Sequence, residues 1–201
     1  IDVVINNAGM GMFSPLESLT SGPLDMVMNT NFKGPILVIQ HVLSYMHKQN
    51  SGLIINIASI AGNNGLPFRS IYSASKSALM RVSESLRLEL RHTPIQCTVV
   101  SPGSIKTSIS SNRYYAGVSK DSIYYKQYEL GRLDMDNHVN KGLLPIVVAT
   151  KIEKIINKKN IKPHYVVGPL LEELSSIIKF ILPQRMYENL IASFYNLNQT
   201  K

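Results

Sequence analysis

Tyr72 and Lys76 are the residues of this sequence whose types and spacing point most directly to chemistry. They enclose the segment Tyr-Ser-Ala-Ser-Lys, and residues four apart on a helix share one face. An ammonium group beside a phenol stabilises the phenolate and lowers the phenol pKa from its usual value of about 10. Such a phenol can give a proton to a carbonyl oxygen or take one from an alcohol. With ten Tyr residues in the chain, the same spacing also arises by chance as a half-exposed helical pair.

Three further groups of residues occur where the chain leaves a strand or enters a helix. Ser59 closes the apolar run 53–58, Asn31 opens a helical segment, and Pro102-Gly103 follows the apolar run 95–100. Open α/β sheets form their sites at the carboxyl ends of the strands. We therefore expect these residues to meet at one edge of a sheet, where Ser59 could hydrogen-bond a substrate oxygen.

The elements that must position these residues alternate along the chain. Short apolar runs indicate parallel strands covered on both faces, and apolar residues at helical spacing indicate helices between them. The strands are expected at 3–5, 53–58, 95–100 and 165–167, and the helices at 32–49, 71–91, about 146–158, 170–182 and 184–195. This rhythm predicts an α/β fold with a parallel sheet. The weakly periodic, Tyr- and Ser-rich segment 104–143 is expected to be an insertion that acts as a lid or binding loop.

Composition narrows the class of protein. The 201 residues carry a net charge of +8, with 44% apolar and 17% charged residues, which is typical of a folded globular domain. A single Cys, Cys97, excludes a disulfide framework and is expected in the core. No metal site, nucleic-acid partner or transmembrane span is expected. The sequence thus predicts a soluble protein of a reducing compartment, the cytoplasm.

Taken together, the motifs resemble those of the short-chain dehydrogenase/reductase family, in that family's order and spacing. They are Asn7-Ala8-Gly9, Asn31, Ser59, Tyr72-x-x-x-Lys76 and Pro102-Gly103-x-Ile105-x-Thr107. The resemblance is strong from Ile1 to about Thr107 and looser to the C-terminus. The segments 9–17 and 66–68 are most similar to those of 17β-hydroxysteroid and retinol dehydrogenases.

The resemblance implies a Rossmann-type doubly wound sheet, an NAD(P)(H) cofactor and a role for each motif. Tyr72 would be the catalytic acid/base, Lys76 would lower its pKa and hold the nicotinamide ribose, and Ser59 would orient the carbonyl oxygen. Asn31 would hold a water that links Lys76 to solvent. The cofactor-binding residues would be Asn7, Ala8, Gly9, Tyr72, Lys76, Pro102, Gly103, Ile105 and Thr107. Asn7 could instead be a turn former, and Ser59 a strand-end hydroxyl.

In one respect the sequence departs from the family pattern. The family's first strand and its Thr-Gly-x-x-x-Gly-x-Gly turn, which binds the cofactor pyrophosphate, have no counterpart before Ile1. We expect residues 1–201 to form a single partial Rossmann-type domain, N-terminally truncated, with the first three strands absent. The choice between NAD and NADP is then left open, because the missing part would hold the residue that makes it.

Two functions from different classes follow. The first is hydride transfer between a nicotinamide cofactor and an alcohol or ketone, with Met10, Met12 and Phe68 favouring a lipophilic substrate. The alternative is a naturally short, non-catalytic protein that binds a partner, although such a protein has no chemical need for Asn31, Ser59, Tyr72 and Lys76 together. A Ser59 hydrolase is disfavoured because the Gly-x-Ser-x-Gly elbow is absent. The resemblance also implies a homo-oligomer that associates through the helices 32–49 and 71–91.

Overall fold

The computed structural model describes residues 1–109 and 111–197. Ser110, which belongs to the expected insertion, and residues 198–201 at the end of the expected domain lie outside the described residues.

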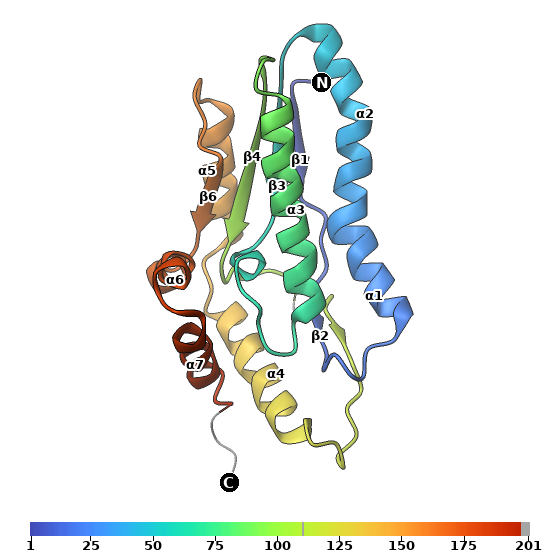
Figure 1. Cartoon of the computed structure of the whole chain (residues 1–201), viewed down its shortest axis with the longest axis vertical. Coiled ribbons are helices and arrows are strands. Elements are labelled where there is room, and N and C mark those ends of the chain that lie inside the picture. The colour runs from blue at the N-terminus through green and yellow to red at the C-terminus, as the bar shows by residue number, and fades with distance from the viewer. Residues whose placement is uncertain (110, 198–201) are drawn as a thin grey trace.

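The centre of the molecule is a four-stranded parallel sheet with the strand order β1-β3-β4-β6 (Figure 1). The strands are β1 (Val3–Asn6), β3 (Gly52–Ile57), β4 (Ile95–Pro102) and β6 (His164–Val167). Each is a short run rich in Val and Ile, the composition favoured on a buried pleated surface. All four expected strands are confirmed, and each observed strand end lies within two residues of the expected one.

Helices cover both faces of this sheet, as the doubly wound prediction requires. On one face α2 (Gly34–Gln49) and α3 (Ser70–Glu89) pack over Ile54 and Cys97. On the other, α5 (Pro145–Ile156) packs over Ile55 and Val100. Because successive strand residues point to opposite faces, Ile54 and Ile55 belong to two different cores. Cys97 is a buried free thiol, as expected.

The helix expected at 32–49 begins earlier than the sequence indicates. A continuous helical stretch runs through α1 (Ser21–Met28) and a π-helical segment η1 (Asn29–Lys33) into α2 (Figure 1). Gly34 and Pro35 usually mark a boundary, because Pro lacks the helical N–H donor. Here the helix continues through Gly34 and Pro35, because the wide π turn of η1 immediately precedes them. A Cβ on Gly34 would lie only 3.2 Å from the Asn29 carbonyl oxygen, so a glycine suits this close approach.

The segment 104–143 contains regular structure that the sequence did not indicate. Its two-residue strand β5 (Tyr114–Tyr115) pairs in parallel with β2 (Met12–Phe13), and α4 (Tyr125–Asn140) follows. The helix was missed because its buried stripe is narrow and includes Gly131, a poor helix former. A Cβ on Gly131 would lie 3.2 Å from the Phe13 ring, so the glycine permits close packing of α4 against β2.

Two more helices, α6 (Leu170–Ile181) and α7 (Gln184–Phe194), end the described chain and are separated by Pro183 as expected. They lie beside the sheet at the end where the strands finish (Figure 1). Among the described residues, no helix combines the length and apolar character needed to cross a membrane.

Candidate active site

Asn31 lies in the π-helical segment η1 and is completely buried. Its Oδ1 accepts a hydrogen bond from the Met10 N–H at 2.9 Å, and its Nδ2 donates to the Met10 carbonyl at 3.0 Å. The same Nδ2 donates to Ser75 Oγ at 3.0 Å, and that hydroxyl donates to the Tyr72 carbonyl at 2.8 Å. Asn31 therefore joins the loop after β1 to the turn of α3 that carries Tyr72. π turns are common at functional sites.

Tyr72 is buried near the start of α3, with 5% of its surface exposed. Burial by itself would raise its pKa, but the positive charges of Lys76, Arg69 and Arg113 and a hydrogen bond with Ser59 oppose this and leave the pKa below the usual value. The ring packs in an apolar cluster with Met12. The phenol is thus shielded from water, and its pKa is lower than that of a free phenol.

Lys76 is also buried, and its Nζ donates a hydrogen bond to the Ile57 carbonyl at 2.9 Å. Burial lowers its pKa, and the neighbouring Tyr72 counteracts part of that shift. An ammonium group has three donors, so Nζ has further donors besides the one bound to Ile57. A Cβ on Gly9 would lie 3.2 Å from Nζ and 3.4 Å from Asn31 Oδ1. Because Gly9 has no side chain, Lys76 Nζ is not covered from the side of Gly9. A ribose hydroxyl of a nicotinamide cofactor fits the remaining donors of Lys76.

Ser59 follows β3 and is the N-cap of the short helix η2 (Ile60–Gly62). Its Oγ accepts the Ala61 N–H at 3.2 Å and lies 3.4 Å from the Pro102 carbonyl, to which it donates. The hydroxyl also reaches Tyr72. Ser59 thus makes the contacts expected of a strand-end hydroxyl, and its role toward a substrate oxygen stays a prediction.

The segment Pro102–Thr107 leaves the sheet at the end of β4, and we call it the 102–107 loop. The Gly103 N–H donates to the Val167 carbonyl at 2.9 Å, and the buried Ile105 forms an isolated parallel bridge with Leu143. Thr107 is exposed, and its hydroxyl accepts the Ile109 N–H at 3.3 Å. Through Pro102 the loop contacts Ser59.

The turn Asn7-Ala8-Gly9 after β1 is exposed on the surface. The preceding Asn6 is instead buried, and its Nδ2 donates to Asn56 Oδ1 at 2.7 Å across the two strands. Asn6 is thus part of a polar contact inside the sheet, while Asn7, Ala8 and Gly9 remain accessible to a ligand.

Two charged residues of the site were missed by sequence reasoning. Arg69, the N-cap of α3, lies over the Tyr72 ring, and its position three residues before Tyr72 is a signal that could have revealed it. Arg113 has a buried side chain that donates to Tyr115 at 2.8 Å and pairs with Asp136 at 3.1 Å. Nothing in the sequence places Arg113 near Tyr72, because β5 is too short to be recognised.

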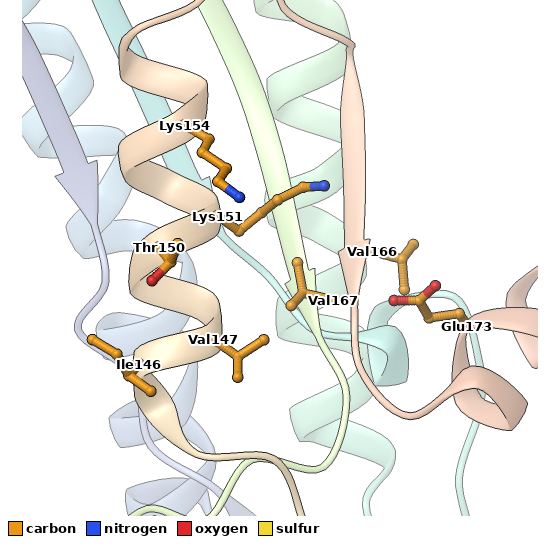
Figure 2. A pocket seen from close by; sticks show the side chains of 8 residues that line it. All are labelled: Ile146, Val147, Thr150, Lys151, Lys154, Val166, Val167 and Glu173. Carbon is orange, nitrogen blue, oxygen red and sulfur yellow. The ribbon is translucent and has the colours of Figure 1, made fainter.

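A surface pocket of about 440 Å³ lies elsewhere, between α5, β6 and the start of α6 (Figure 2). Lys151 and Lys154 project into it from α5, opposite Val166 and Val167 of β6. None of the candidate site residues lines it, and α5 covers the face of the sheet opposite α3. This pocket and the candidate residues around Tyr72 are therefore separate features of the molecule.

Comparison with known proteins decides the family. A model described as short chain dehydrogenase matches residues 1–116, which is more than half of the chain. The chain belongs to the short-chain dehydrogenase family. The resemblance inferred from the motifs is thereby confirmed, together with the Rossmann-type α/β fold.

Relatives of this chain include proteins named as reductases and dehydrogenases. The chain is 37% identical to a 3-ketodihydrosphingosine reductase of Bacteroides thetaiotaomicron, over 97% of this chain and 73% of the relative. It is 31% identical to retinol dehydrogenase 8 of Bos taurus, over 78% of this chain and 52% of the relative. The chain thus spans about three quarters of the first relative and about half of the second.

Solved structures agree on the fold. A short-chain dehydrogenase from Streptomyces avermitilis superposes with a TM-score of 0.74 at 22% identity, covering 96% of this chain and 72% of that one. Other structures with this fold are complexes with NADP+ or with NADH. The expected cofactor class, NAD(P)(H), is confirmed for the family, and the choice between the two forms stays open.

Proposed function

We propose that the protein carrying this chain is an NAD(P)-dependent oxidoreductase that interconverts an alcohol and a ketone, with Tyr72 as its acid/base. The observation that carries the proposal is the buried Tyr72 phenol, held beside Lys76 and Ser59 with its pKa lowered. A buried phenol with a lowered pKa suits proton exchange with a carbonyl or alcohol oxygen. The membership of the family and the names of the relatives support the same reaction class.

The nicotinamide cofactor, when bound, supplies the hydride chemistry. This chain's residues would do the rest. Tyr72 gives its proton to the substrate oxygen in reduction and takes it back in oxidation. Ser59 orients that oxygen and stabilises the negative charge that develops on it. Lys76 would hold the ribose and lowers the phenol pKa, while Asn31 fixes the loop after β1 against α3.

The remaining site residues would line the cofactor. Asn7, Ala8 and Gly9 are exposed after the end of β1, and Gly9 lies beside Lys76, so this turn is open to the cofactor. Pro102, Gly103, Ile105 and Thr107 are proposed to place the nicotinamide carboxamide. The water that the resemblance assigns to Asn31 remains a prediction, since the amide of Asn31 already bonds Met10 and Ser75.

The proposed substrate is a lipophilic ketone or alcohol. Tyr72 packs with Met12, Met10 and Leu66 in an apolar cluster. Phe68 belongs to a second cluster with Phe13 and Tyr128 of α4. The first cluster includes Tyr114 of the proposed 104–143 lid, and the second joins Phe68 of the loop before α3 to Tyr128 of the same lid. The relative that is 37% identical is named as a 3-ketodihydrosphingosine reductase, and this name supports the same class of substrate.

The test is hydride transfer by the full-length protein, followed through the absorbance of NADH and NADPH. The substrates are a long-chain 3-keto sphingoid base, retinal and a ketone of three or four carbons. We expect kcat/KM for the long-chain ketone to exceed that for the short one at least about tenfold, because each buried CH2 contributes about 0.8 kcal/mol. Equal kcat/KM values would overturn the lipophilic assignment. Binding of NADH or NADPH without turnover of any alcohol or ketone would favour the non-catalytic alternative.

A homo-oligomer is proposed as well. Leu37, Val38 and Tyr45 on α2 and Leu88 on α3 are exposed, on the two helices that the family resemblance names as association surfaces. Light scattering on the purified protein tests this, and a monomer at micromolar concentration would contradict it.

A further inference from the structure

The 102–107 loop is hydrogen-bonded to the carboxylate of Glu172, a residue of α6. Glu172 Oε2 accepts the backbone N–H of Ser104 at 2.6 Å, and Oε1 accepts the Ser104 hydroxyl at 2.6 Å. Both carboxylate oxygens are therefore bound to one residue of the loop. Hydrogen bonds to an ionised group are short and strong. Here they cross from the start of α6 to a loop 68 residues earlier in the chain.

Two glycines, Gly103 and Gly168, leave room for the Glu172 carboxylate. A Cβ on Gly103 would overlap Glu172 Oε2 and would lie 3.4 Å from Gly168 Cα. A Cβ on Gly168 would lie 3.2 Å from Gly103 Cα. Two glycines, one at the end of β4 and one at the end of β6, thus leave the space that the Glu172 carboxylate occupies. Neither glycine has a positive φ angle. The absence of a side chain at these two positions is therefore explained by the close approach of neighbouring atoms and not by the backbone conformation.

Glu172 is also favourably placed on its own helix. It lies in the first turn of α6 with Glu173, where the helix dipole favours negative charge. The neighbouring Glu173 makes a different contact, since its Oε1 accepts the Gly168 N–H at 3.1 Å. Two adjacent carboxylates of the same helical turn therefore hold different segments: Glu172 holds the 102–107 loop, and Glu173 holds the end of β6.

The helix itself is anchored near the site by further contacts. Lys179 of α6 donates to the Asn63 carbonyl, and Tyr187 of α7 donates to Asn64 Oδ1 at 2.8 Å. Both acceptors belong to the segment that follows Ser59 and η2. The position of Glu172 is thus set relative to the loop of Ser59 as well as to the 102–107 loop.

We infer that Glu172 is a positioning residue for cofactor binding, which presets the 102–107 loop to receive the nicotinamide end of NAD(P)H. The inference rests on the proposed function, which gives this loop its role at the carboxamide. A loop that is already held in its binding conformation does not lose conformational freedom when the ligand binds. Glu172 thereby raises the affinity for the intact cofactor without touching it.

The experiment measures binding of NADH, NADPH and their fragments without nicotinamide, ADP-ribose and 2′-phospho-ADP-ribose, by calorimetry on the full-length protein. The variant Glu172→Ala removes both hydrogen bonds. We expect the Kd for the intact cofactor to rise about tenfold, which corresponds to about 1.4 kcal/mol. The Kd for the fragment is expected to stay within about twofold, because the fragment does not reach the loop. KM for the cofactor should rise in parallel, with a smaller change in kcat.

Matched variants separate positioning from general damage. Glu173→Ala removes the same charge from the same turn and should leave both Kd values within about twofold. Glu172→Gln keeps an acceptor for the Ser104 N–H and can donate to its hydroxyl, so it should restore most of the affinity. If Glu172→Ala does not fold, Ser104→Ala removes one of the two bonds and should raise the intact-cofactor Kd about threefold while the fragment Kd is unchanged.

The results that overturn the inference are distinct from those that overturn the function. If the wild-type protein binds neither NADH nor NADPH, the proposed function fails. If it binds one of them, but Glu172→Ala weakens cofactor and fragment equally or behaves like Glu173→Ala, the inference fails while the function stands. An unchanged Kd in Ser104→Ala, where Glu172→Ala is unfolded, also contradicts the inference.

Discussion

The guanidinium carbon of Arg69 lies 4.9 Å from the centroid of the Tyr72 ring. A cation over an aromatic face is attracted to it, and here it also faces the phenol that we propose as the acid/base. Together with Lys76 and Arg113 it lowers the Tyr72 pKa. Arg69 Nε is buried without a hydrogen-bond partner among the described residues.

The pH dependence of turnover follows from this arrangement. Oxidation needs the Tyr72 phenolate, so kcat for oxidation should rise with pH through the lowered pKa, and kcat for reduction should fall there. Arg69→Gln removes a positive charge and should move both profiles to higher pH, whereas Arg69→Lys should move them less. Arg81→Gln, a change at an exposed position of α3, is the control. Profiles that coincide for Arg69→Gln and Arg81→Gln would rule out this role for Arg69.

Removal of the Tyr72 hydroxyl tests the acid/base directly. Tyr72→Phe should reduce kcat about a thousandfold, in the range of general acid/base contributions, and leave the Kd for the cofactor within about threefold. Tyr45→Phe, at an exposed position of α2, should leave kcat unchanged. The measurement is steady-state kinetics together with cofactor titration. A kcat within tenfold of the wild-type value in Tyr72→Phe would exclude Tyr72 as the acid/base.

Asn31 should matter for stability as well as for activity. Asn31→Ala leaves the Met10 N–H and carbonyl without their partner in a part-buried site. We expect the free energy of unfolding to fall by about 2–3 kcal/mol, since each unsatisfied buried group costs about 1–3 kcal/mol. Asn157→Ala removes an exposed contact to Glu153 and serves as the control. Urea denaturation curves of the two variants check this, and equal midpoints would contradict it.

Gly103 should tolerate no side chain. In Gly103→Ala the new Cβ would overlap Glu172 Oε2, so either the loop or α6 must shift. Overpacking of this kind costs about 1–3 kcal/mol, and the affinity for NAD(P)H should fall as in Glu172→Ala. At Gly117 a Cβ would meet nothing within 4 Å, so Gly117→Ala should change neither quantity. Thermal unfolding and cofactor titration measure both; a Gly103→Ala protein identical to wild type would show that the contact is dispensable.

Cys97 should be chemically inert in the folded protein. Burial raises the pKa of its thiol to about 11, and the thiolate is the reactive species. At pH 7 we expect no reaction with a thiol reagent in buffer and one full equivalent of reaction in denaturant. Rapid modification without denaturant would mean that this part of the core opens readily.

Much of the fold could be predicted because its signals are local. The apolar runs of β3 and β4 and the spacing of Tyr72 and Lys76 depend on residues that are close in sequence, and parallel strands place their carboxyl ends together. The start of the helix before α2 was predicted wrongly, because Gly34 and Pro35 are ordinary boundary residues and a π turn has no clear sequence pattern. Helix α4 was missed for a different reason, because its buried stripe is narrow and includes Gly131.

The sequence by itself determined the family, the order of the strands along the chain and the residues from Asn31 to Lys76 that are candidates for catalysis. Only the tertiary structure decided which charges surround Tyr72 and what holds the 102–107 loop. Arg113 reaches the site through the two-residue strand β5, and Glu172 reaches Ser104 across 68 residues. Such contacts depend on how the packed elements are placed in space, and periodicity and motif spacing carry no information about that placement.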